Sequence, residues 1–428
     1  MLDIRVIREH PEQIKERLAT RGASYPIDEV LSLDKERRAH DSELQKLNAE
    51  RNRLSKEIGG RKKGGASTED LEAQVKSFSA RMAELNRLTA ELDERQRNLL
   101  LSIPNLPHDE CPLGADAASN PVVREWGEKP SFDFEPQDHV ALAERLGLID
   151  FERAAKISGS GFACFTGWGA RLERALLNFL LDKQTGENGY REIAPPFLIR
   201  RDCMVGTGQL PKFEEDMYGL DDGALFLAPT AEVPVTNLYR EELLSESDLP
   251  IKMAAYSPCF RREAGATGRD TRGILRVHQF DKVELVKIVS AATSEAEHEG
   301  LTRDAESILQ ALGLHYRVIE LCTGDLGFSA AKTYDIEVWA PGRGAYLEVS
   351  SSSNFGDYQA RRMGLRYKGE DGKNRICHTL NASGTALPRL YIALIETYQQ
   401  RDGSVLLPPA LAGAMGGEGN LHLKAERG

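Results

Sequence analysis

Two long series of apolar residues, spaced alternately by three and four positions, constrain the fold of this chain more than any other feature. They are separated by a short segment rich in glycine and lysine. One apolar stripe on each of two consecutive helices is typical of an antiparallel coiled-coil hairpin. We therefore expect helices at about residues 28–58 and 69–103, each on the order of 45 Å long, with a break at Gly59–Gly60 and Gly64–Gly65 between them. The stripes consist of Val30, Leu33, Arg37, His40, Leu44, Leu47, Arg51, Leu54 and Ile58, and of Leu71, Val75, Phe78, Met82, Leu85, Thr89, Leu92, Gln96, Leu99 and Ile103.

The part of this hairpin near its turn is basic, although the whole chain has a formal net charge of −11. Seven basic and only two acidic residues fall within residues 46–63. A projecting basic arm is suited to nucleic-acid phosphates, and phosphate contacts position a partner without reading its sequence. The basic residues are Lys46, Arg51, Arg53, Lys56, Arg61, Lys62 and Lys63.

The rest of the chain mixes strand-like and helix-like segments, which predicts an α+β fold. Three prolines between residues 104 and 112 end the hairpin and begin an irregular connector to about residue 138. A helix at about 170–184 then leads to a strand-like segment at 190–197. Ahead of the hairpin, residues 1–25 are predicted to form a short helical segment.

Length and composition restrict the class of protein. A chain of 428 residues with 41% hydrophobic residues should form two or three domains with a large core. The six cysteines are scattered without a CxxC pair, which favours neither disulfides nor a zinc site and is typical of a reducing compartment. The N-terminus resembles no secretory signal, and no apolar run reaches the roughly 20 residues that span a bilayer. We expect a soluble cytoplasmic protein without zinc.

The segment 260–284, FRREAGATGRDTRGILRVHQFDKVE, is predicted to form two strands joined by a polar loop at 264–273. In the first strand Arg261 and Glu263 share a face, and Phe260 and Arg262 point away from it. A guanidinium, carboxylates and an aromatic ring on one sheet surface suit a ligand with a phosphate, an amine and a flat base. In the second strand one face carries Arg276, His278, Phe280, Lys282 and Glu284, and the other carries Leu275, Val277, Val283 and Leu285.

This segment resembles motif 2 of the class II aminoacyl-tRNA synthetases, in the form found in seryl-tRNA synthetases. The resemblance lies in its FRxE, its GRDTRG loop and its RVHQFDKVE strand, and it extends from the opening MLDIRVIREHPE to near Gln400. It implies a tRNA-binding domain at 1–105 with the coiled-coil arm. It also implies a catalytic domain at 106–428 on a mixed, mainly antiparallel sheet flanked by helices. The motifs fall at about 170–197 (motif 1, which builds a homodimer interface in the family), 253–288 (motif 2) and 376–400 (motif 3).

The resemblance also implies how ATP is bound. Arg261 would hold the α-phosphate and the substrate carboxylate, because a planar guanidinium meets an oxyanion with two parallel hydrogen bonds. Phe280 would stack on adenine. Arg389, near the start of a helix expected at Gly384, would hold the γ-phosphate, since a helix N-terminus and a guanidinium both attract an anion. The implied ATP-binding residues are Arg261, Arg262, Glu263, Val277, Phe280, Glu348, Val349, Ser350, Ser351 and Arg389.

Glu348 and Ser351, in the segment AYLEVSSSSN, are the implied ligands of Mg²⁺, which prefers hard oxygen donors. Residues three apart in a regular strand point to opposite faces. A bulge or a strand end must therefore separate these two residues if both bind one ion. Without the resemblance, an exposed serine-rich turn is an equally good interpretation. In the same run Ser352 stands where the family often has cysteine.

A third group of residues would bind L-serine. The segment Thr230–Ala231–Glu232 binds the amino group in the family, although such a pattern by itself equally starts a helix. Glu284 and Ser383 would contact the serine hydroxyl, so that alanine is rejected for its missing hydroxyl and threonine for its bulk. The implied serine-binding residues are Thr230, Ala231, Glu232, Arg261, Glu284, Asn381 and Ser383, and those implied in catalysis are Arg261, Glu284 and Arg389.

Together these features predict ATP-dependent activation of L-serine to seryl-adenylate, followed by transfer to the 3′ end of tRNA(Ser) and of tRNA(Sec). Catalysis would rest on positioning and charge neutralisation, without a covalent enzyme intermediate. One alternative is a related ligase that loads a small amino acid onto a carrier protein or metabolite, for which a long basic arm has no evident use. Another is a non-catalytic nucleic-acid-binding paralogue, which two phosphate-binding arginines and Glu348 disfavour.

Overall fold

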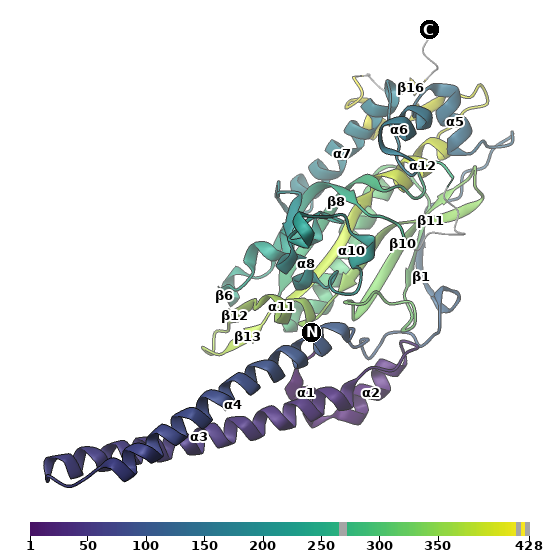
Figure 1. Ribbon diagram of the computed structural model, residues 1–428. Helices are drawn as coiled ribbons and strands as arrows, with labels where there is room; N and C mark the ends of the chain where they lie inside the picture. The colour runs from purple at the N-terminus through teal and green to yellow at the C-terminus, as the bar shows by residue number, and fades with distance from the viewer. Residues whose placement is uncertain (265–271, 417–420, 424–428) are drawn as a thin grey trace. The chain divides into compact units, whose positions relative to one another are not determined.

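The computed structural model describes residues 1–264, 272–416 and 421–423 (Figure 1). The chain divides into two compact units. The first comprises Met1–Ala19 and Ala23–Pro104, and the second comprises Thr20–Gly22 and Asn105–Gly428. Each unit is described by itself. In the described part of the chain, no helix is long and apolar enough to cross a membrane.

The first unit is entirely helical in its regular structure. Two short helices, α1 (Ile4–Glu9) and α2 (Pro11–Ala19), bury Ile7, Ile14 and Leu18. Two long helices, α3 (Ile27–Lys63) and α4 (Glu69–Ser102), form the hairpin (Figure 1). All predicted stripe residues are buried or half-buried. The predicted coiled-coil arm is therefore confirmed.

Contacts between the two long helices show that they run antiparallel. The side-chain Nε2 of Gln96 donates to the carbonyl of Val30 at 3.3 Å, and Arg81 forms an ion pair with Glu43 at 2.8 Å. Gln96, near the end of α4, thus meets Val30, near the start of α3, and Arg81 meets Glu43 farther along the hairpin. Gln96, a polar residue in an otherwise apolar stripe, is buried but has a hydrogen-bond partner, as buried polar groups require.

The first long helix is longer than predicted: it continues through Gly59 and Gly60, and only the second predicted glycine pair forms the turn. The helix continues to Lys63, and the turn lies at Gly64 and Gly65. Each glycine in a helix interior costs about 1 kcal/mol relative to alanine. Beyond them, Arg61 pairs with Glu57 at 2.7 Å and with Asp70 of the other helix at 3.2 Å. These ion pairs help to hold the last turn of α3 in helical form.

The second unit is built on an eight-stranded sheet with the order β1-β9-β10-β11-β14-β8-β7-β2. All neighbours are antiparallel except β2 and β7, which confirms the mixed, mainly antiparallel sheet. The strands are β1 (Val122–Trp126), β9 (Tyr316–Glu320), β10 (Lys332–Ala340), β11 (Ala345–Asn354), β14 (His378–Ala386), β8 (Gln279–Val289), β7 (Ile251–Phe260) and β2 (Arg191–Glu192).

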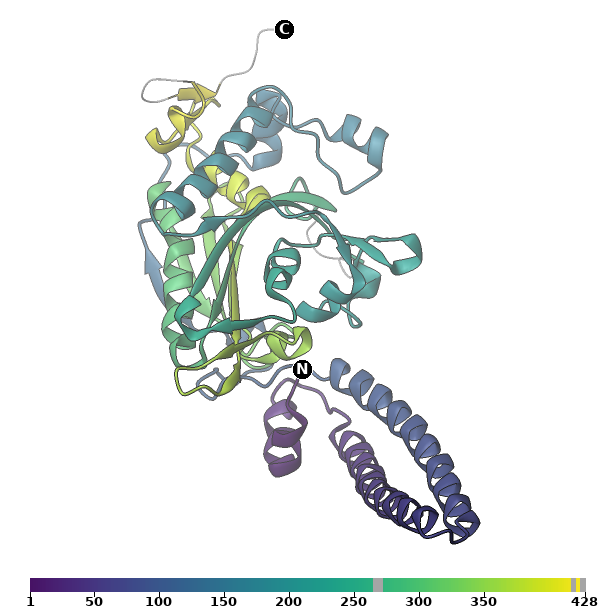
Figure 2. The ribbon, with the colours of Figure 1, turned by 90° about the vertical axis from the view of Figure 1, so that its left-hand side faces the viewer.

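Three helices cover one face of this sheet: α7 (Trp168–Gly186), α10 (Ser294–Ala311) and α12 (Leu387–Thr397). Side chains of β8 alternate between two apolar clusters, because successive residues of a strand point to opposite faces. Val283 and Leu285 join the large core with these helices, as predicted. Val286 and Ile288 join a smaller core on the other face. Figure 2 shows α10 on one side of the sheet and the teal segment at 200–240 on the other.

The remaining elements surround the sheet. The strand β1 lies inside the connector that was predicted to be irregular, and it forms the sheet edge beside β9. The smaller sheets contain β3 (Leu198–Arg200), β5 (Leu225–Leu227) and β4 (Gly219–Leu220); β13 (Asn374–Ile376), β12 (Arg366–Lys368) and β6 (Leu243–Ser245); and β15 (Val405–Leu407) with β16 (Leu421–Leu423). The other helices are α5 (His139–Leu146), α6 (Phe151–Ser158), α8 (Arg201–Thr207), α9 (Glu232–Thr236), α11 (Tyr358–Met363) and α13 (Pro409–Ala412).

The paired strands β7 and β8 are shorter than predicted. β7 ends at Phe260, so Arg261 and Glu263 follow the strand, and Glu263 has a φ of 51°. β8 begins only at Gln279. Most of the loop predicted between them, residues 265–271 with much of the GRDTRG motif, lies outside the described residues. Left-handed backbone is uncommon outside glycine, and at Glu263 it turns the chain out of the sheet.

The helix predicted to begin near Gly384 begins at Leu387, because β14 extends to Ala386. Pro388 lies in the first turn of α12, where its missing N–H leaves no hydrogen bond unmade. Arg389 follows it and is carried at the N-terminal end of the helix, as the sequence predicted.

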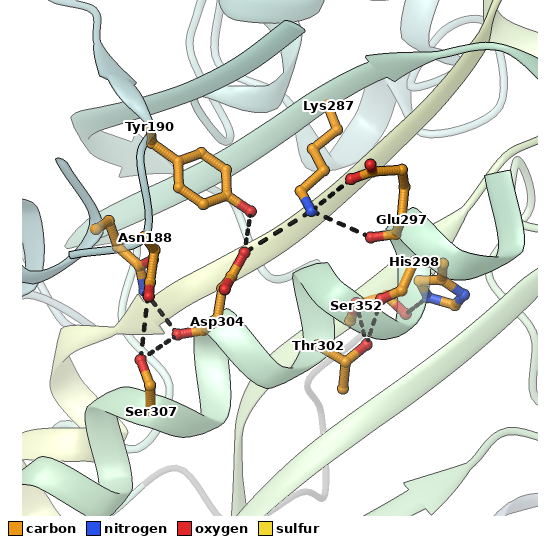
Figure 3. A network of polar contacts seen from close by, with 10 residues as sticks. Asn188, Tyr190, Lys287, Glu297, His298, Thr302, Asp304, Ser307 and Ser352 are labelled. Carbon is orange, nitrogen blue, oxygen red and sulfur yellow. Dashed lines mark hydrogen bonds and ion pairs between the residues drawn. The ribbon is translucent and has the colours of Figure 1, made fainter. Parts of the chain in front are cut away.

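A polar network lies buried under the helices on the covered face of the sheet (Figure 3). The ammonium group of Lys287 on β8 pairs with Glu297 at 2.9 Å and with Asp304 at 3.7 Å, both from α10. The hydroxyl of Tyr190 donates to Asp304 at 2.7 Å. Only 1% of the Lys287 side chain is exposed, so these contacts replace its lost hydration.

Candidate active site

A cavity of about 770 Å³ opens on the face of the sheet that α7, α10 and α12 do not cover. Its walls come from β8, β10, β11 and β14, from the start of α12, and from segments near residues 207–217, 229–232 and 321–330. Most of the residues predicted to form the site line this one cavity. They are Thr230, Glu232, Arg261, Glu263, Val277, Phe280, Glu284, Glu348, Val349, Ser351, Asn381, Ser383 and Arg389.

Three predicted residues do not line the cavity. Ala231 is fully buried in the small core, and the hydroxyl of the buried Ser350 donates to the carbonyl of Ser383 at 2.5 Å. The guanidinium of Arg262 lies over the ring of Tyr218, with 5.9 Å between the guanidinium carbon and the ring centroid. The side chain of Arg262 thus points away from its neighbour Arg261, as strand alternation predicted.

Arg261 is held with its guanidinium inside the cavity. Its Nε donates to the carbonyl of Pro229 at 3.3 Å, and its guanidinium carbon lies 5.4 Å from the centroid of Phe280. Glu263 pairs instead with Arg276 at 3.2 Å. Within the described residues Arg261 and Glu263 form no salt bridge with each other, so the guanidinium of Arg261 is not neutralised by this neighbour.

The second arginine lies across the cavity beside the serine-rich strand. The NH1 of Arg389 donates to the carbonyl of Glu348 at 2.8 Å and lies 3.4 Å from its carboxylate. A cation at the N-terminus of α12 is disfavoured by the helix dipole. An anion bound between the two would reverse this penalty, because both attract it.

The bulge expected between Glu348 and Ser351 is present. In the pairing of β10 with β11, Ile336 lies opposite Ser350 and Glu337 lies opposite Glu348, which leaves Val349 as the extra residue. The hydroxyl of Ser351 consequently reaches the carboxylate of Glu348 at 3.2 Å. Both oxygen donors face the cavity, which fits a hard cation such as Mg²⁺. Within the described residues, no group of three or more His, Cys, Asp or Glu side chains is arranged to hold a metal ion.

A small acidic pocket lies at the other end of the cavity. Glu284 accepts a hydrogen bond from Asn381 at 2.9 Å, and its second oxygen lies 2.6 Å from the ammonium of Lys282. Glu232 accepts from Gln359 at 2.7 Å. Burial, and next the nearby carboxylate of Glu284, raise the pKa of Glu232 to about 7. A bound ammonium group would lower this pKa again, because a nearby positive charge favours the ionised carboxylate.

Thr230 also performs the ordinary role that its pattern allows. Its hydroxyl accepts a hydrogen bond from the backbone N–H of Glu232, at the start of α9, at 3.2 Å. The same hydroxyl lines the cavity. Thr230 therefore both caps the start of α9 and forms part of the cavity wall.

Several cavity residues were not predicted to have a role. Lys282 had been placed on the correct face of its strand, and its alternation with Phe280 and Glu284 was the available signal. Asp335 lines the cavity, and the buried Gln359 supports Glu232 from behind it; neither had such a signal, because β10 and α11 have local patterns that resemble ordinary core elements. Only the pairing of strands and helices brings them to the site.

Comparison with known proteins agrees with this geometry. The family model for the seryl-tRNA synthetase N-terminal domain matches residues 1–107. The model for the class II tRNA synthetase core domain (G, H, P, S and T) matches residues 213–398. A relative from Akkermansia muciniphila, named serine--tRNA ligase, is 63% identical over 420 residues, which cover 98% of each chain.

The chain belongs to the seryl-tRNA synthetase family. A serine--tRNA ligase from Geobacillus kaustophilus is 53% identical over 97% of this chain and 99% of the relative. Among solved structures, the seryl-tRNA synthetase from Pyrococcus horikoshii complexed with ATP has a TM-score of 0.93 at 38% identity, covering 100% of both chains. The cytoplasmic serine-tRNA ligase from Naegleria fowleri in complex with AMP has a TM-score of 0.88 at 29% identity, covering 100% of this chain and 99% of the other.

Proposed function

We propose that this chain is a cytoplasmic, ATP-dependent ligase that activates L-serine and transfers it to the 3′ end of tRNA(Ser) and tRNA(Sec). The observation that carries the proposal is the position of Arg261, Arg389 and Glu348 around one cavity with an acidic pocket at its end. A triphosphate needs separated cationic groups, and a small amino acid needs a carboxylate for its ammonium. The membership of the family supports the same activity.

In the first step, a carboxylate oxygen of serine attacks the α-phosphorus of ATP, and pyrophosphate leaves. Arg261 would hold the attacking carboxylate and the α-phosphate together, which lowers the entropy cost of their meeting. Its charge, and that of Arg389 on the leaving phosphates, would stabilise the negative charge that grows in the transition state. Phe280, stacked against Arg261, offers a flat surface for adenine.

Glu348 and Ser351 would hold Mg²⁺ with ATP. When bound, the ion neutralises charge on the phosphate oxygens. Arg389 contacts the backbone of Glu348, so this chain itself keeps the phosphate-binding arginine and the proposed metal ligands together.

Selection of serine would come from the acidic pocket. Glu232 would receive the ammonium group, and Glu284 with Ser383 would receive the hydroxyl. Glu284 is almost fully buried and Lys282 already compensates its charge, so it is placed to accept a hydrogen bond from a neutral donor. A ligand without the hydroxyl leaves this buried carboxylate short of a partner, which costs about 1–3 kcal/mol.

The test is ATP–pyrophosphate exchange with serine, threonine, alanine and glycine at saturating Mg²⁺. We expect exchange with serine at a catalytic efficiency at least about a hundredfold above that with alanine. A folded sample without serine-dependent exchange would contradict the proposal. Equal exchange with serine and alanine would contradict the role of Glu284 and Ser383.

We propose further that the hairpin of the first unit binds the tRNA. Among the seven predicted basic residues, Arg53, Arg61 and Lys62 form ion pairs with acidic residues of the hairpin. Lys46, Lys56 and Lys63 are exposed and, within the described residues, form no salt bridge. Their charges remain available to phosphates, which would recognise the shape of the RNA rather than its sequence.

This role is tested by replacing Lys46, Lys56 and Lys63 together with glutamate. Aminoacylation of tRNA should fall more than about tenfold and become less dependent on salt, while pyrophosphate exchange stays unchanged. The matched control replaces three exposed basic residues near the base of the hairpin, Lys35, Arg38 and Arg97, with glutamate. An equal loss of charging in both variants, or a loss of exchange, would contradict the assignment.

Transfer to a carrier protein or metabolite is the second candidate for the acceptor, and the exposed lysines of the hairpin favour tRNA over it. We also propose a homodimer, supported by the resemblance of residues 170–197 to motif 1. Light scattering should give about twice the chain mass of 47.4 kDa. A mass equal to one chain at micromolar concentration would contradict the dimer.

A further inference from the structure

Asp335, on β10, is a buried acid on the floor of the cavity without a complete set of partners. It lines the cavity, only 9% of it is exposed, and its Oδ1 has no hydrogen-bond partner. In the strand register it lies directly opposite Ser351. Its side chain therefore shares a sheet face with Ser351, and through the bulge also with Glu348.

The charges that act most strongly on Asp335 are those of other acids. The neighbouring charge that acts on it most strongly is the carboxylate of Glu348, followed by Glu337 and Asp325. Ser351 has one hydroxyl hydrogen, for which the carboxylates of Glu348, at 3.2 Å, and Asp335 compete. A single hydroxyl cannot donate to two carboxylates at once. Glu348 has a cationic partner in Arg389, whose NH1 lies 3.4 Å from its carboxylate, whereas Oδ1 of Asp335 has no hydrogen-bond partner.

The next acid on the same strand shows that the fold can compensate such a charge. Glu337, two residues along, is paired with Arg317 of β9 at 2.6 Å. Glu337 does not line the cavity, whereas Asp335 does. Burial of a carboxylate without a counter-charge costs several kcal/mol. Asp335, for which no salt bridge occurs within the described residues, thus lies at the point where a ligand can reach it.

We propose that Asp335 is a third oxygen donor of the cation site, acting with Glu348 and Ser351 on the divalent ion that accompanies ATP. This inference rests on the proposed use of Mg²⁺–ATP. Two carboxylates and a hydroxyl on adjacent strands form a compact set of hard oxygen donors, which is the chemistry that Mg²⁺ and Mn²⁺ select. Arg389 then binds phosphate beside a site whose acids are neutralised by the ion.

The experiment compares Asp335→Asn with wild type and with Glu337→Gln, which removes the same charge from the same strand outside the cavity. Binding of Mn²⁺ to the full chain, with ATP present and serine absent, is followed by the loss of the free-ion EPR signal. We expect Asp335→Asn to weaken Mn²⁺ binding about tenfold or more. Glu337→Gln should stay within about twofold of wild type.

A second measurement separates this role from a structural one. Without metal, Asp335→Asn removes an uncompensated buried charge, so its Tm should equal or exceed that of wild type. A lower Tm, or a variant that fails to fold, would show that Asp335 stabilises the fold and would overturn the proposal.

The outcomes also separate this inference from the proposed function. Wild-type affinity for Mn²⁺ in Asp335→Asn, or an equal loss in Glu337→Gln, would overturn the role of Asp335 alone. A wild-type chain that binds no Mn²⁺ in the presence of ATP would overturn the proposed use of a divalent ion and this inference together.

Discussion

The two faces of the central sheet treat buried polar groups in opposite ways. On the helix-covered face, Lys287 has two acidic partners, and the ring of His298 contacts the carbonyl of Ser352 at 2.9 Å (Figure 3). On the cavity face, Asp335 has an oxygen without a partner, and the pKa of Glu232 is raised to about 7 by burial and by Glu284. The fold itself supplies the partners of Lys287 and His298, and we infer that a ligand completes those of Asp335 and Glu232.

This difference teaches which substitutions should affect stability and which should affect activity. Lys287 lies only three residues after Glu284 on the same strand, yet it points to the other face. Removing a group whose partners are part of the fold leaves those partners unpaired. Removing a group whose partner would be a ligand should leave the stability of the ligand-free protein almost unchanged. Four substitutions test this distinction, in order of the expected effect.

The largest effect is expected for Arg389→Ala, which removes a cation proposed to hold the phosphates. Serine-dependent pyrophosphate exchange should fall about 10²–10³-fold, because a charge that stabilises the transition state is lost. Its free energy of unfolding should stay within about 1 kcal/mol of wild type. The control is Arg317→Ala, an arginine on the same face that pairs with Glu337 outside the cavity. A loss of exchange in the control equal to that in Arg389→Ala would contradict the distinction.

Lys287→Met should show the opposite behaviour. It leaves Glu297 and Asp304 without their buried counter-charge, so urea unfolding should reveal a loss of about 3 kcal/mol. Exchange per folded molecule should remain within about twofold of wild type, because the network lies on the covered face. A stable variant with strongly reduced exchange would show that the two faces are not separate in their effects.

Glu232 provides a test through pH. Its carboxyl group is protonated below about pH 7 in the free protein, and an ammonium ligand requires the ionised form. Serine binding, measured by calorimetry, should therefore weaken as the pH falls below 7, approaching tenfold per pH unit, and should release a proton near pH 7. Glu232→Gln should bind serine about 10–100-fold more weakly at pH 8 and lose this pH dependence.

The same group has a predictable effect on stability. Its folded-state pKa is raised above the ordinary value of 4.5, so the folded protein binds the proton more tightly than the unfolded chain. The stability that this proton contributes is present at low pH and is lost as the pH rises through 7. In the absence of serine, Glu232→Gln should thus be at least as stable as wild type at pH 8. A less stable variant would contradict this sign.

The smallest effect is expected for Ser352→Ala. The hydroxyl of Ser352 accepts a hydrogen bond from Thr302 at 2.8 Å under the sheet. Its loss should cost about 1 kcal/mol in urea unfolding and leave exchange unchanged. The neighbouring Ser351→Ala, on the cavity face, is the matched comparison and should lower exchange with little change in stability. The reverse pattern would show that these two serines had been assigned to the wrong faces.

Much of this architecture could be predicted from the sequence, because the signals were local. The stripe from Val30 to Ile103 indicated the hairpin through helical periodicity, and the alternation of Phe280, Lys282 and Glu284 indicated a polar strand face. The motif residues from Arg261 to Arg389 indicated the family and part of the cavity wall. Periodicity and short motifs involve residues that are close in the sequence, so they can be recognised without knowledge of the fold.

Other features depended on tertiary structure. Strand pairing places Asp335 opposite Ser351, and the packing of α11 brings Gln359 to Glu232. Whether Glu348 and Ser351 share a face depends on the bulge at Val349, which the sequence could only require and not locate. These contacts join residues that are far apart along the chain. The local conformational preferences of these residues are the same whether or not the distant partners meet. Only the register and packing of the complete sheet decide whether they do.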